Sequence, residues 1–544
     1  MCEKKAQEVQ QHNAIPNPDS VGHASITAGR MCLENKKYQE AIEHFKQALE
    51  TQEKFLLPNH QSLAVTHNHI AATHYKQHEY AKSLPHYIKG VEIERGCLPD
   101  DHPTIAGSYH NVCTAYLGMG KFDEAFAYEK KAIEQCKKRR NPNPSALKQY
   151  TGHAAVVLQK KGDNSKAIQY FEEAMNIITD DDDDESTAGL YYSMGNAYDS
   201  LKRFPEALNS FKRTLELERK HLESDAPTIA ATLNSISDVY QSLSKYDDAF
   251  SYAQEAVNHL RKRSNPDPQL LAKCLHQAGH VLQNQKKHEK AIEYFNEALS
   301  ALLAIHDGHS RQLAPIYYRT AESYHALHRF DKALDAYTQT LRVETATLPD
   351  DHPTISTTFF KISEVCMKLS QYDNALKYGN DALRQLRKRP DPHPAEVARS
   401  LVHLSKVLEK KGESSKAVEY LEEGVSLMET ILDSNDSQLA AIYHHLGGIY
   451  YRLERYDQAL IYYKKTLDVE LRTLPADAPT IAVTYSNTAT AYFGLKKYDQ
   501  AIQYSDKATE QLLKTKKEHD EEVQRQRKYT ESVKKKKMLK DIYN

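Results

Sequence analysis

A short pattern, an aromatic residue followed three positions later by alanine, recurs along the chain at a nearly fixed interval. Eight clear copies end at Ala41, Ala125, Ala207, Ala249, Ala333, Ala375, Ala459 and Ala501. Weaker copies that end at Ser83, Ala167, Ala291 and Ala417 fill the gaps, which gives twelve anchors separated by ten intervals of 42 residues and one of 40. An internal period of this length predicts a stack of similar units rather than several independent globular domains.

Each unit has the apolar spacing of two amphipathic helices. Upstream of the eleventh anchor, Tyr443, Leu446, Gly447 and Tyr450 share one helical face, and downstream Tyr463 continues the pattern on a second helix. The small anchor residue lets the two helices approach closely, while the aromatic residue before it covers the turn. We therefore predict an all-α fold of about twelve helix-turn-helix units, each 42 residues long.

Composition agrees with this prediction and excludes several classes of protein. Glycine (19) and proline (20) are scarce among the 544 residues, as expected for long helices with few turns. The 72 basic and 74 acidic residues give a formal net charge of −2, and no segment is apolar enough to cross a bilayer. We therefore expect neither nucleic-acid binding nor membrane insertion. The seven cysteines form no C-x-x-C pair, and this usage predicts a cytoplasmic protein.

A longer period groups the units in threes. Pro-Thr-Ile begins at positions 103, 227, 353 and 479, and Pro-x-Pro recurs with nearly the same steps from position 16. We therefore predict four tandem blocks of three repeats. The expected organisation is an N-terminal tail at 1–17, repeats 1–3 at 18–143, repeats 4–6 at 144–267, repeats 7–9 at 268–393, repeats 10–12 at 394–518, and a capping helix with a basic tail at 519–544.

The linkers between certain repeats carry a family resemblance. LPDDHPTIA at 98–106, LPDDHPTIS at 348–356 and LPADAPTIA at 474–482 resemble the linkers of kinesin light chains, which are built from long tetratricopeptide repeats. The resemblance implies a solenoid wound as a right-handed superhelix, with the first helix of each pair lining a concave groove. It also implies a scaffold or cargo adaptor for protein or peptide partners, with a kinesin heavy chain or its cargo among them.

Two other functions stay open beside the adaptor. One is a genuine light-chain subunit of a kinesin motor, and the other is a regulator with a cryptic site. The sequence contains no phosphate-binding glycine loop, nucleophile elbow or H-E-x-x-H motif. We therefore expect no catalysis, cofactor or metal, and we interpret the pair His74 and His78 as structural. The sequence indicates no oligomeric state.

Polar residues of the first helices are the candidate peptide-binding positions. Kinesin light chains often carry asparagine there, and a carboxamide can both donate to and accept from the backbone of an extended peptide. The matching residues are Asn68, Asn111, Asn234 and Asn487, and other repeats place His276, His444 and Arg319 in the same region. The alternative is that these residues are polar filler on a solvated face.

Basic residues that end the second helices of repeats 3, 6 and 9 form a second candidate surface. They are Lys138 and Arg139, then Arg261, Lys262 and Arg263, and finally Arg387, Lys388 and Arg389. Cations at a helix C-terminus are stabilised by the helix dipole, which explains each cluster separately. The alternative is a basic stripe that meets acidic peptides.

Overall fold

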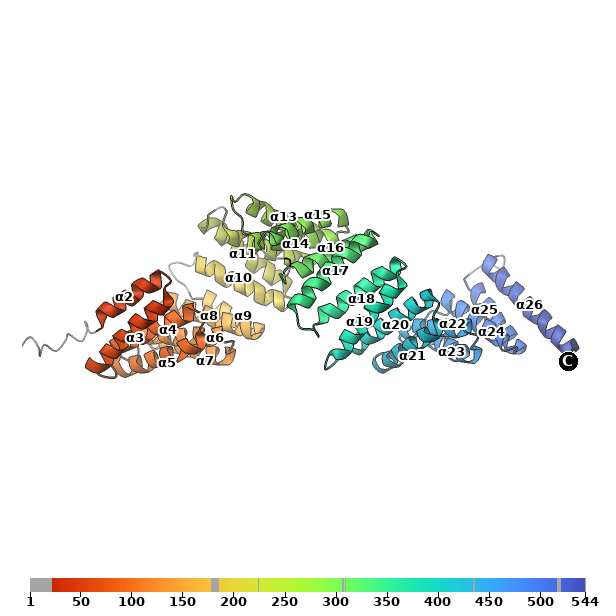
Figure 1. Ribbon diagram of the computed structural model, residues 1–544, viewed down its shortest axis with the longest axis horizontal. Coiled ribbons are helices and arrows are strands. Elements are labelled where there is room, and N and C mark those ends of the chain that lie inside the picture. The colour runs from red at the N-terminus through yellow and green to blue at the C-terminus, as the bar shows by residue number, and fades with distance from the viewer. Residues whose placement is uncertain are drawn as a thin grey trace, which may run out of the picture. The chain divides into compact units, whose positions relative to one another are not determined.

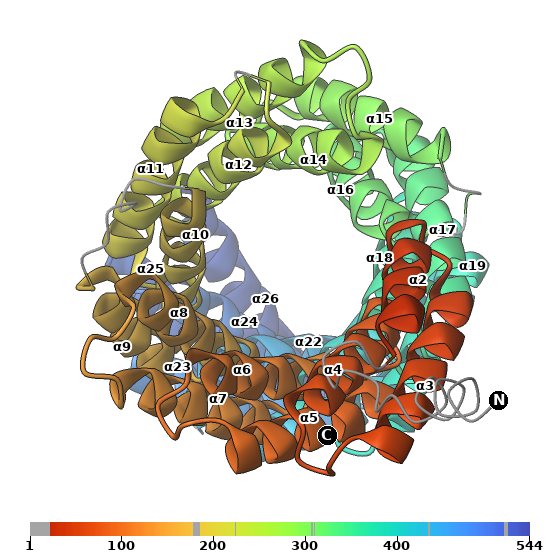
Figure 2. The same cartoon turned by 90° about the vertical axis from the view of Figure 1, so that its left-hand side faces the viewer.

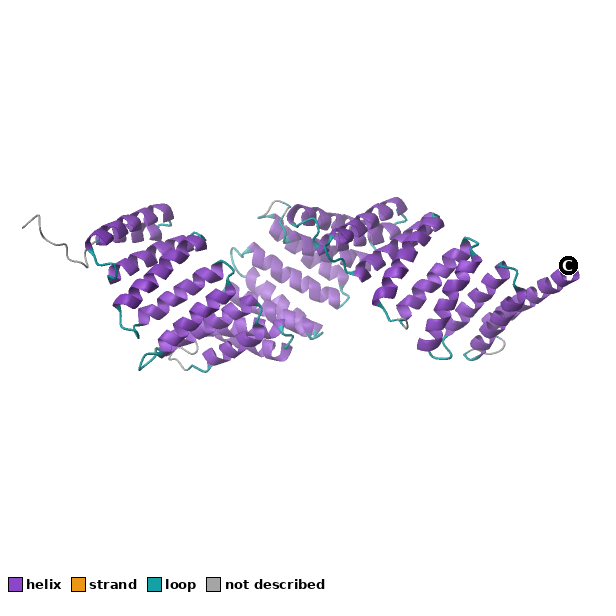
Figure 3. Ribbon diagram, turned by 90° about the horizontal axis from the view of Figure 1, so that it is seen from below, coloured by secondary structure: helices purple, strands orange, loops and turns teal. Residues whose placement is uncertain are grey.

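The computed structural model describes residues 22–177, 185–223, 225–305, 308, 310–433, 436–515 and 520–543. These residues form twenty-five α-helices joined by short loops, and they contain no β-strand (Figure 1, Figure 3). The prediction of an all-α fold is therefore confirmed. The predicted tail at 1–17 lies outside the described residues.

The chain divides into two compact units, Met1–Asp267 and Pro268–Asn544. The division coincides with one expected block boundary, and the other boundaries stay predictions. The helices of the first unit are α2 (His23–Glu34), α3 (Tyr38–Phe55), α4 (Gln61–Lys76), α5 (Tyr80–Cys97), α6 (Pro103–Gly118), α7 (Phe122–Lys137), α8 (Pro144–Lys161), α9 (Asn164–Met175), α10 (Glu185–Ser200), α11 (Phe204–His221), α12 (Pro227–Ser242) and α13 (Tyr246–Arg261).

The helices of the second unit continue the same alternation. They are α14 (Pro268–Asn284), α15 (His288–Leu303), α16 (Leu313–Ala326), α17 (Phe330–Thr347), α18 (Pro353–Lys368), α19 (Tyr372–Lys388), α20 (Pro394–Lys411), α21 (Ser414–Ile431), α22 (Ser437–Arg452), α23 (Tyr456–Thr473), α24 (Pro479–Gly494), α25 (Tyr498–Leu513) and α26 (Glu521–Tyr543). The helices α2 to α25 make twelve consecutive pairs, which confirms the predicted number of repeats.

Within each unit a helix packs mainly against the helices that precede and follow it in sequence. The first helices of the pairs lie on the inner side of each unit and the second helices on the outer side, as α4/α5 and α12/α13 show in one unit and α16/α17 in the other (Figure 2). We call the side formed by the first helices the inner face. No helix within the described residues combines the length and the apolar character that crossing a bilayer requires.

The anchor residues lie where the two helices of a pair meet. All twelve of them, including Ser83, have no exposed surface. In several repeats a glycine of the first helix faces an aromatic ring of the second, so that a Cβ atom at Gly447 would come within 2.8 Å of the Tyr463 ring. The small residues therefore set the distance between the paired helices.

The turn inside each pair has one geometry throughout the chain. In all twelve repeats the residue five positions before the anchor has a positive φ, and in only three of them is it a glycine: Gly120, Gly162 and Gly412. The other nine, such as Lys36, His78 and Ser244, adopt the left-handed region with φ between 57° and 60°. A non-glycine residue pays roughly 1 kcal/mol or more for this conformation, so the packing of the pair imposes the turn.

The last helix, α26, covers the second helix of repeat 12. Val523 and Val533 of α26 are fully buried. The Ser505 hydroxyl of α25 lies 2.7 Å from the Thr530 hydroxyl and accepts a hydrogen bond of 2.7 Å from the Gln526 side-chain amide. The final pair is therefore closed by a helix of charged outer surface, as the end of a solenoid requires.

Enlarging an anchor should separate a helix pair. We expect Ala459→Leu to lower the free energy of unfolding by about 1–3 kcal/mol, because Ala459 has no exposed surface and the added methyl groups must displace neighbouring side chains. Gln458→Leu, one position earlier and exposed, is the matched control and should change it by less than about 0.5 kcal/mol. Urea denaturation followed by circular dichroism measures both, and equal effects would contradict the packing role of the anchor.

Candidate functional site

One buried glutamate recurs in every predicted block. It lies eleven positions after the anchor of the middle repeat, as Glu94, Glu218, Glu344 and Glu470, and these residues are 5%, 7%, 5% and 6% exposed. The other eight repeats have glutamine, cysteine, isoleucine, leucine or methionine there. The helical pair therefore forms without a carboxylate at this position. Since burying a carboxylate costs free energy unless it is fully paired, its return in every block suggests a use other than packing.

Glu344 lies near the end of α17 and faces the beginning of α18. Its Oε2 atom is buried and has no hydrogen-bond partner. Burial raises the pKa of the Glu344 carboxyl group, whereas the hydroxyls of Thr358 and Thr354 and the charge of His352 act in the opposite direction. The N-terminus of α18 also favours a negative charge at this place.

Glu470 repeats this arrangement at the end of α23. Burial again raises the pKa of the carboxyl group, and the hydroxyls of Thr484 and Thr480 on α24 oppose the shift. The Oε2 atom of Glu470 is also buried and without a hydrogen-bond partner. Both carboxylates thus have threonine hydroxyls of the next helix nearby and one buried oxygen, Oε2, without a hydrogen-bond partner, as Glu94 and Glu218 also have.

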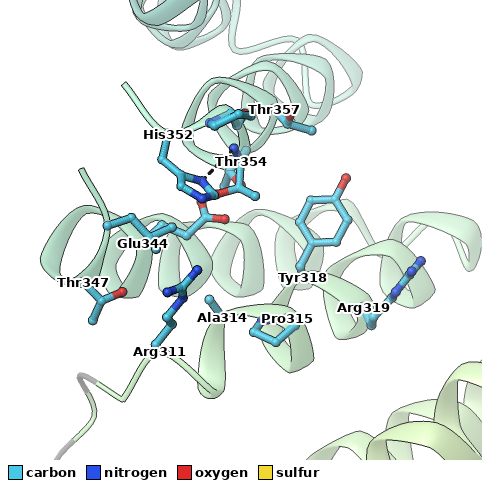
Figure 4. Close-up of a pocket in the computed structure, with 13 residues that line it drawn as sticks. Arg311, Ala314, Pro315, Tyr318, Arg319, Glu344, Thr347, His352, Thr354 and Thr357 are labelled. Atoms are coloured by element: carbon cyan, nitrogen blue, oxygen red, sulfur yellow. Dashed lines mark hydrogen bonds between the residues drawn. The ribbon is translucent and has the colours of Figure 1, made fainter. Parts of the chain in front are cut away.

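Each of these two glutamates borders a cavity. The cavity beside Glu344 has a volume of about 370 Å³ and is lined by the start of α16, the end of α17 and the start of α18 (Figure 4). The cavity beside Glu470 has a volume of about 480 Å³ and is lined by the corresponding parts of α22, α23 and α24. Their apolar walls contain Ala314, Pro315 and Leu348 in the first, and Ala440, Ala441 and Leu474 in the second. The same cavity is therefore built twice, between first helices of neighbouring repeats.

The two cavities differ in charge. The exposed Arg311 and the partly exposed Arg319 line the cavity beside Glu344, and Figure 4 shows Arg311, Glu344 and His352 on the same side of it. Arg319 is engaged by Glu322, with 2.9 Å between Nη1 and Oε2. Ser437 stands at the position of Arg311 in the other cavity. The cavity beside Glu470 therefore has no arginine or lysine among its lining residues in the described chain.

This arrangement suits a cationic side chain. The stem of a lysine or arginine can cover the apolar walls, while its charged end donates to the buried carboxylate. The rim is open to such a group, because Ser437 is exposed and Val483 is 51% exposed.

Three of the predicted peptide-binding residues either line one of these cavities or stand at the equivalent position of another repeat. Arg319 and His444 line the two cavities. Asn68 stands fifteen positions before its anchor, as His444 does, and its Nδ2 atom donates to Glu94 Oε1 at 3.3 Å. In the first block the residue at the position of His444 is therefore an amide that donates to the equivalent glutamate.

The remaining predicted residues of the first helices, apart from Asn234, are Asn111, Asn487 and His276. Asn487 is partly exposed, and its Nδ2 atom lies 3.0 Å from Nε2 of His444. Asn111 and His276 are also partly exposed. Burial, together with the charges of His280 and Arg319, lowers the pKa of His276 to about 4, so its imidazole is neutral at physiological pH.

Asn234 does not face solvent, which corrects the expectation that its amide projects into the groove. The residue is 2% exposed, and its Nδ2 atom donates to Asp238 Oδ2 at 3.3 Å on the same helix. The position of Asn234 on α12 directs its side chain toward the interface with the neighbouring helices. Asn234 therefore does not belong to the candidate site.

The basic residues at the ends of second helices are partly used inside the chain. Lys138 pairs with Asp100 at 2.9 Å, Arg263 donates to the Asp225 carbonyl at 2.6 Å, and Arg389 donates to the Pro353 carbonyl at 3.2 Å. Each contact ties the end of a second helix to the loop or first turn at the start of its own pair. Arg139 is partly exposed, whereas Arg261, Lys262, Arg387 and Lys388 are exposed. Arg387 also pairs with Glu423.

The buried glutamates were not predicted from the sequence, although a signal for them is present there. Each one precedes a Pro-Thr-Ile motif by nine residues, so both features share the same period. Only the structure shows that these glutamates are buried and that two of them border cavities.

A family model described as tetratricopeptide repeat matches residues 20–95, 62–138, 147–220, 187–262, 270–346, 354–430 and 438–514. A search of curated proteins returned no match to the sequence.

Similar solved structures include BtubC (BKLC) from P. vanneervenii, which is 15% identical with a TM-score of 0.36, over 47% of this chain and 93% of that one. A putative kinesin light chain with nearly identical TPR-like repeats from Podosopora anserina is 15% identical with a TM-score of 0.35, over 38% and 99% of the two chains. The apo form of RapI is 14% identical with a TM-score of 0.47, over 68% and 98%.

Removing the charge of a cavity glutamate should not destabilise the protein at neutral pH. The folded chain raises the pKa of Glu470, so the stability that this residue contributes is present at acidic pH and is lost as the pH rises through the raised pKa. We expect Glu470→Gln to melt at or above the parent temperature at pH 7, with a difference that shrinks toward pH 4. Scanning calorimetry across this range measures it.

The converse change provides the control. Gln52 occupies the same position in repeat 1, is fully buried, and accepts a hydrogen bond of 2.7 Å from the Thr66 hydroxyl. Gln52→Glu should lower the melting temperature at pH 7 and less so at pH 4. A loss of several degrees in Glu470→Gln at pH 7 would instead mean that the charged carboxylate holds the repeats together.

Proposed function

Since the chain belongs to the tetratricopeptide repeat family, we propose that it is a non-catalytic scaffold that binds extended segments of partner proteins along its inner face. Its inner face is built from the first helices of the pairs, and the two equivalent cavities lie between such helices. The proposed ligand is a peptide segment that inserts lysine or arginine side chains beside Glu344 and Glu470.

One observation carries this proposal: two cavities of the same construction each present a buried carboxylate oxygen without a partner. In the first block Asn68 donates to Oε1 of the equivalent Glu94, although Oε2 of Glu94 is also without a partner. A partner that brings a cation would satisfy Glu344 and Glu470 in a comparable way. Such a ligand would replace the unfavourable burial of a lone charge with a charge-assisted hydrogen bond.

In this proposal the partly exposed polar residues of the inner face contact the peptide backbone. Asn111 and Asn487 can each donate and accept, and Asn487 already lies beside His444 at the rim of the second cavity. The basic stripe at the ends of the second helices is a weaker candidate, because Lys138, Arg263 and Arg389 have internal partners.

The narrower role, a cytoplasmic cargo adaptor of the kinesin light chain type, rests on the linker motifs at 98–106, 348–356 and 474–482. Affinity purification of the full chain followed by mass spectrometry tests it. Recovery of a kinesin heavy chain in comparable amount would support a light-chain subunit. Recovery of other proteins without a heavy chain would favour a scaffold that acts apart from the motor.

Selection of displayed random peptides on the immobilised full chain tests the proposed ligand. We expect the selected peptides to be enriched in lysine and arginine. For such a peptide, Glu470→Gln should weaken binding by roughly 10- to 150-fold in Kd, which corresponds to the loss of a hydrogen bond to a charged group, about 1.5–3 kcal/mol. Isothermal titration calorimetry measures the change.

Glu94→Gln is the matched control and should weaken binding less than Glu470→Gln does, because Oε1 of Glu94 already accepts a hydrogen bond from Asn68. In the Glu470→Gln background, Arg311→Ser should improve binding beside Glu344 by removing the arginine of that cavity. Peptides that bind the parent and Glu470→Gln equally would rule out the carboxylate as the anchor. A selection that yields no binding peptide would contradict the scaffold function itself.

A further inference from the structure

Four potential metal ligands meet in the first unit, at the junction between repeats 3 and 4. His110 of α6, Glu129 of α7 and His153 of α8 place ligand atoms within 4.8 Å of one another. His110 Nδ1 lies 2.9 Å from Glu129 Oε1, and His153 Nδ1 lies 3.3 Å from Glu129 Oε2. The Sγ atom of Cys113, also on α6, lies 3.8 Å from His153 Nδ1. Three consecutive helices thus contribute to one cluster.

We propose that His110, Glu129, His153 and Cys113 bind a single zinc-like divalent ion. Two imidazoles, a carboxylate and a thiolate are ligands that zinc accepts at about 2.0–2.3 Å. Tetrahedral coordination at those lengths places neighbouring ligand atoms roughly 3.3–3.6 Å apart. The separations of 2.9 Å between His110 and Glu129, 3.3 Å between Glu129 and His153, and 3.8 Å between Cys113 and His153 are close to this range. Only small side-chain adjustments are therefore needed to surround an ion.

The surroundings are those of a structural metal site. Glu129 and Cys113 have no exposed surface, and the side chains of His110 and His153 are 18% and 22% exposed. The two histidines lie at the solvent-facing edge of the cluster, which leaves an entry path. An ion bound here would cross-link α6, α7 and α8 and so fasten the first proposed block to the second.

Comparison with the other blocks shows that the fold does not require these residues. Four positions after the anchor, where Glu129 stands in repeat 3, repeats 6, 9 and 12 have Ala253, Gly379 and Ser505. At Gly379 even a Cβ atom would come within 2.7 Å of the Leu404 side chain. A carboxylate buried where related repeats keep a small residue is thus a feature of this one junction. A site for an ion explains the presence of this carboxylate.

The chain contains its own control for the site. His403 stands in repeat 10 at the position that His153 has in repeat 4, and its Nε2 atom lies 2.8 Å from the Ser363 hydroxyl. Ser363 takes the place of Cys113 there, and Phe360 takes the place of His110. His403 therefore shares the helix position of His153 without the other three ligands.

Metal titration of the full chain tests the proposal. After treatment with a chelator and buffer exchange, the protein should bind one equivalent of Zn²⁺ in competition with a chromophoric chelator. Co²⁺ should give the visible bands of a tetrahedral complex and the near-ultraviolet band of a cobalt–thiolate bond. His153→Gln and His110→Gln should each weaken Zn²⁺ binding by at least about 100-fold, while His403→Gln should not.

The glutamine variants keep an amide that can donate to Glu129, so loss of metal binding is separable from loss of folding, which circular dichroism monitors. Cys113→Ser should retain weaker binding and lose the cobalt–thiolate band; an unchanged band would remove Cys113 from the site. The absence of stoichiometric Zn²⁺ binding, or an equal loss in His403→Gln, would overturn the proposal. The cluster would then be a buried carboxylate held by two imidazole N–H groups.

Discussion

The close contact at the anchor residue joins the two helices of each pair, and a pair buries the rest of its apolar surface against the neighbouring pairs. The anchors have no exposed surface, and each helix packs mainly on its neighbours in sequence. Stability therefore comes from a sum of similar local interfaces rather than from one central core. The residues of the inner face contribute little to the packing between helices. Its polar residues can therefore vary between repeats without loss of the fold.

The repeat fold could be predicted from the sequence because its determinants are local and periodic. The anchor alanines and the aromatic residues around them indicated the helix pairs, and the structure confirms twelve of them. The left-handed turn residue escaped prediction, since nine of the twelve are residues such as Lys36 or His78 that rarely adopt a positive φ. The packing of neighbouring helices imposes that conformation, and the local sequence does not indicate it.

The candidate sites were harder to predict because they depend on contacts between repeats. The linker resemblance pointed to amides on the first helices, but Asn234 rotates into the helix interface whereas Asn487 stays partly exposed. The two residues differ by one position in their distance from the anchor, and this small difference in register gives their side chains different environments. The cluster around Glu129 joins residues from three helices, and none of them belongs to a local metal-binding motif. Sequence spacing alone cannot show that they meet.

Repetition within one chain separates what the fold needs from what has been added to it. Features present in all twelve repeats, such as the buried anchor and the left-handed turn, serve the helix pair. The glutamates at 94, 218, 344 and 470 occur once per block, so they are not needed by each pair. Glu129 occurs once in the chain at its position. A buried charge that is rare among equivalent positions is poorly explained by packing. A bound group explains it better.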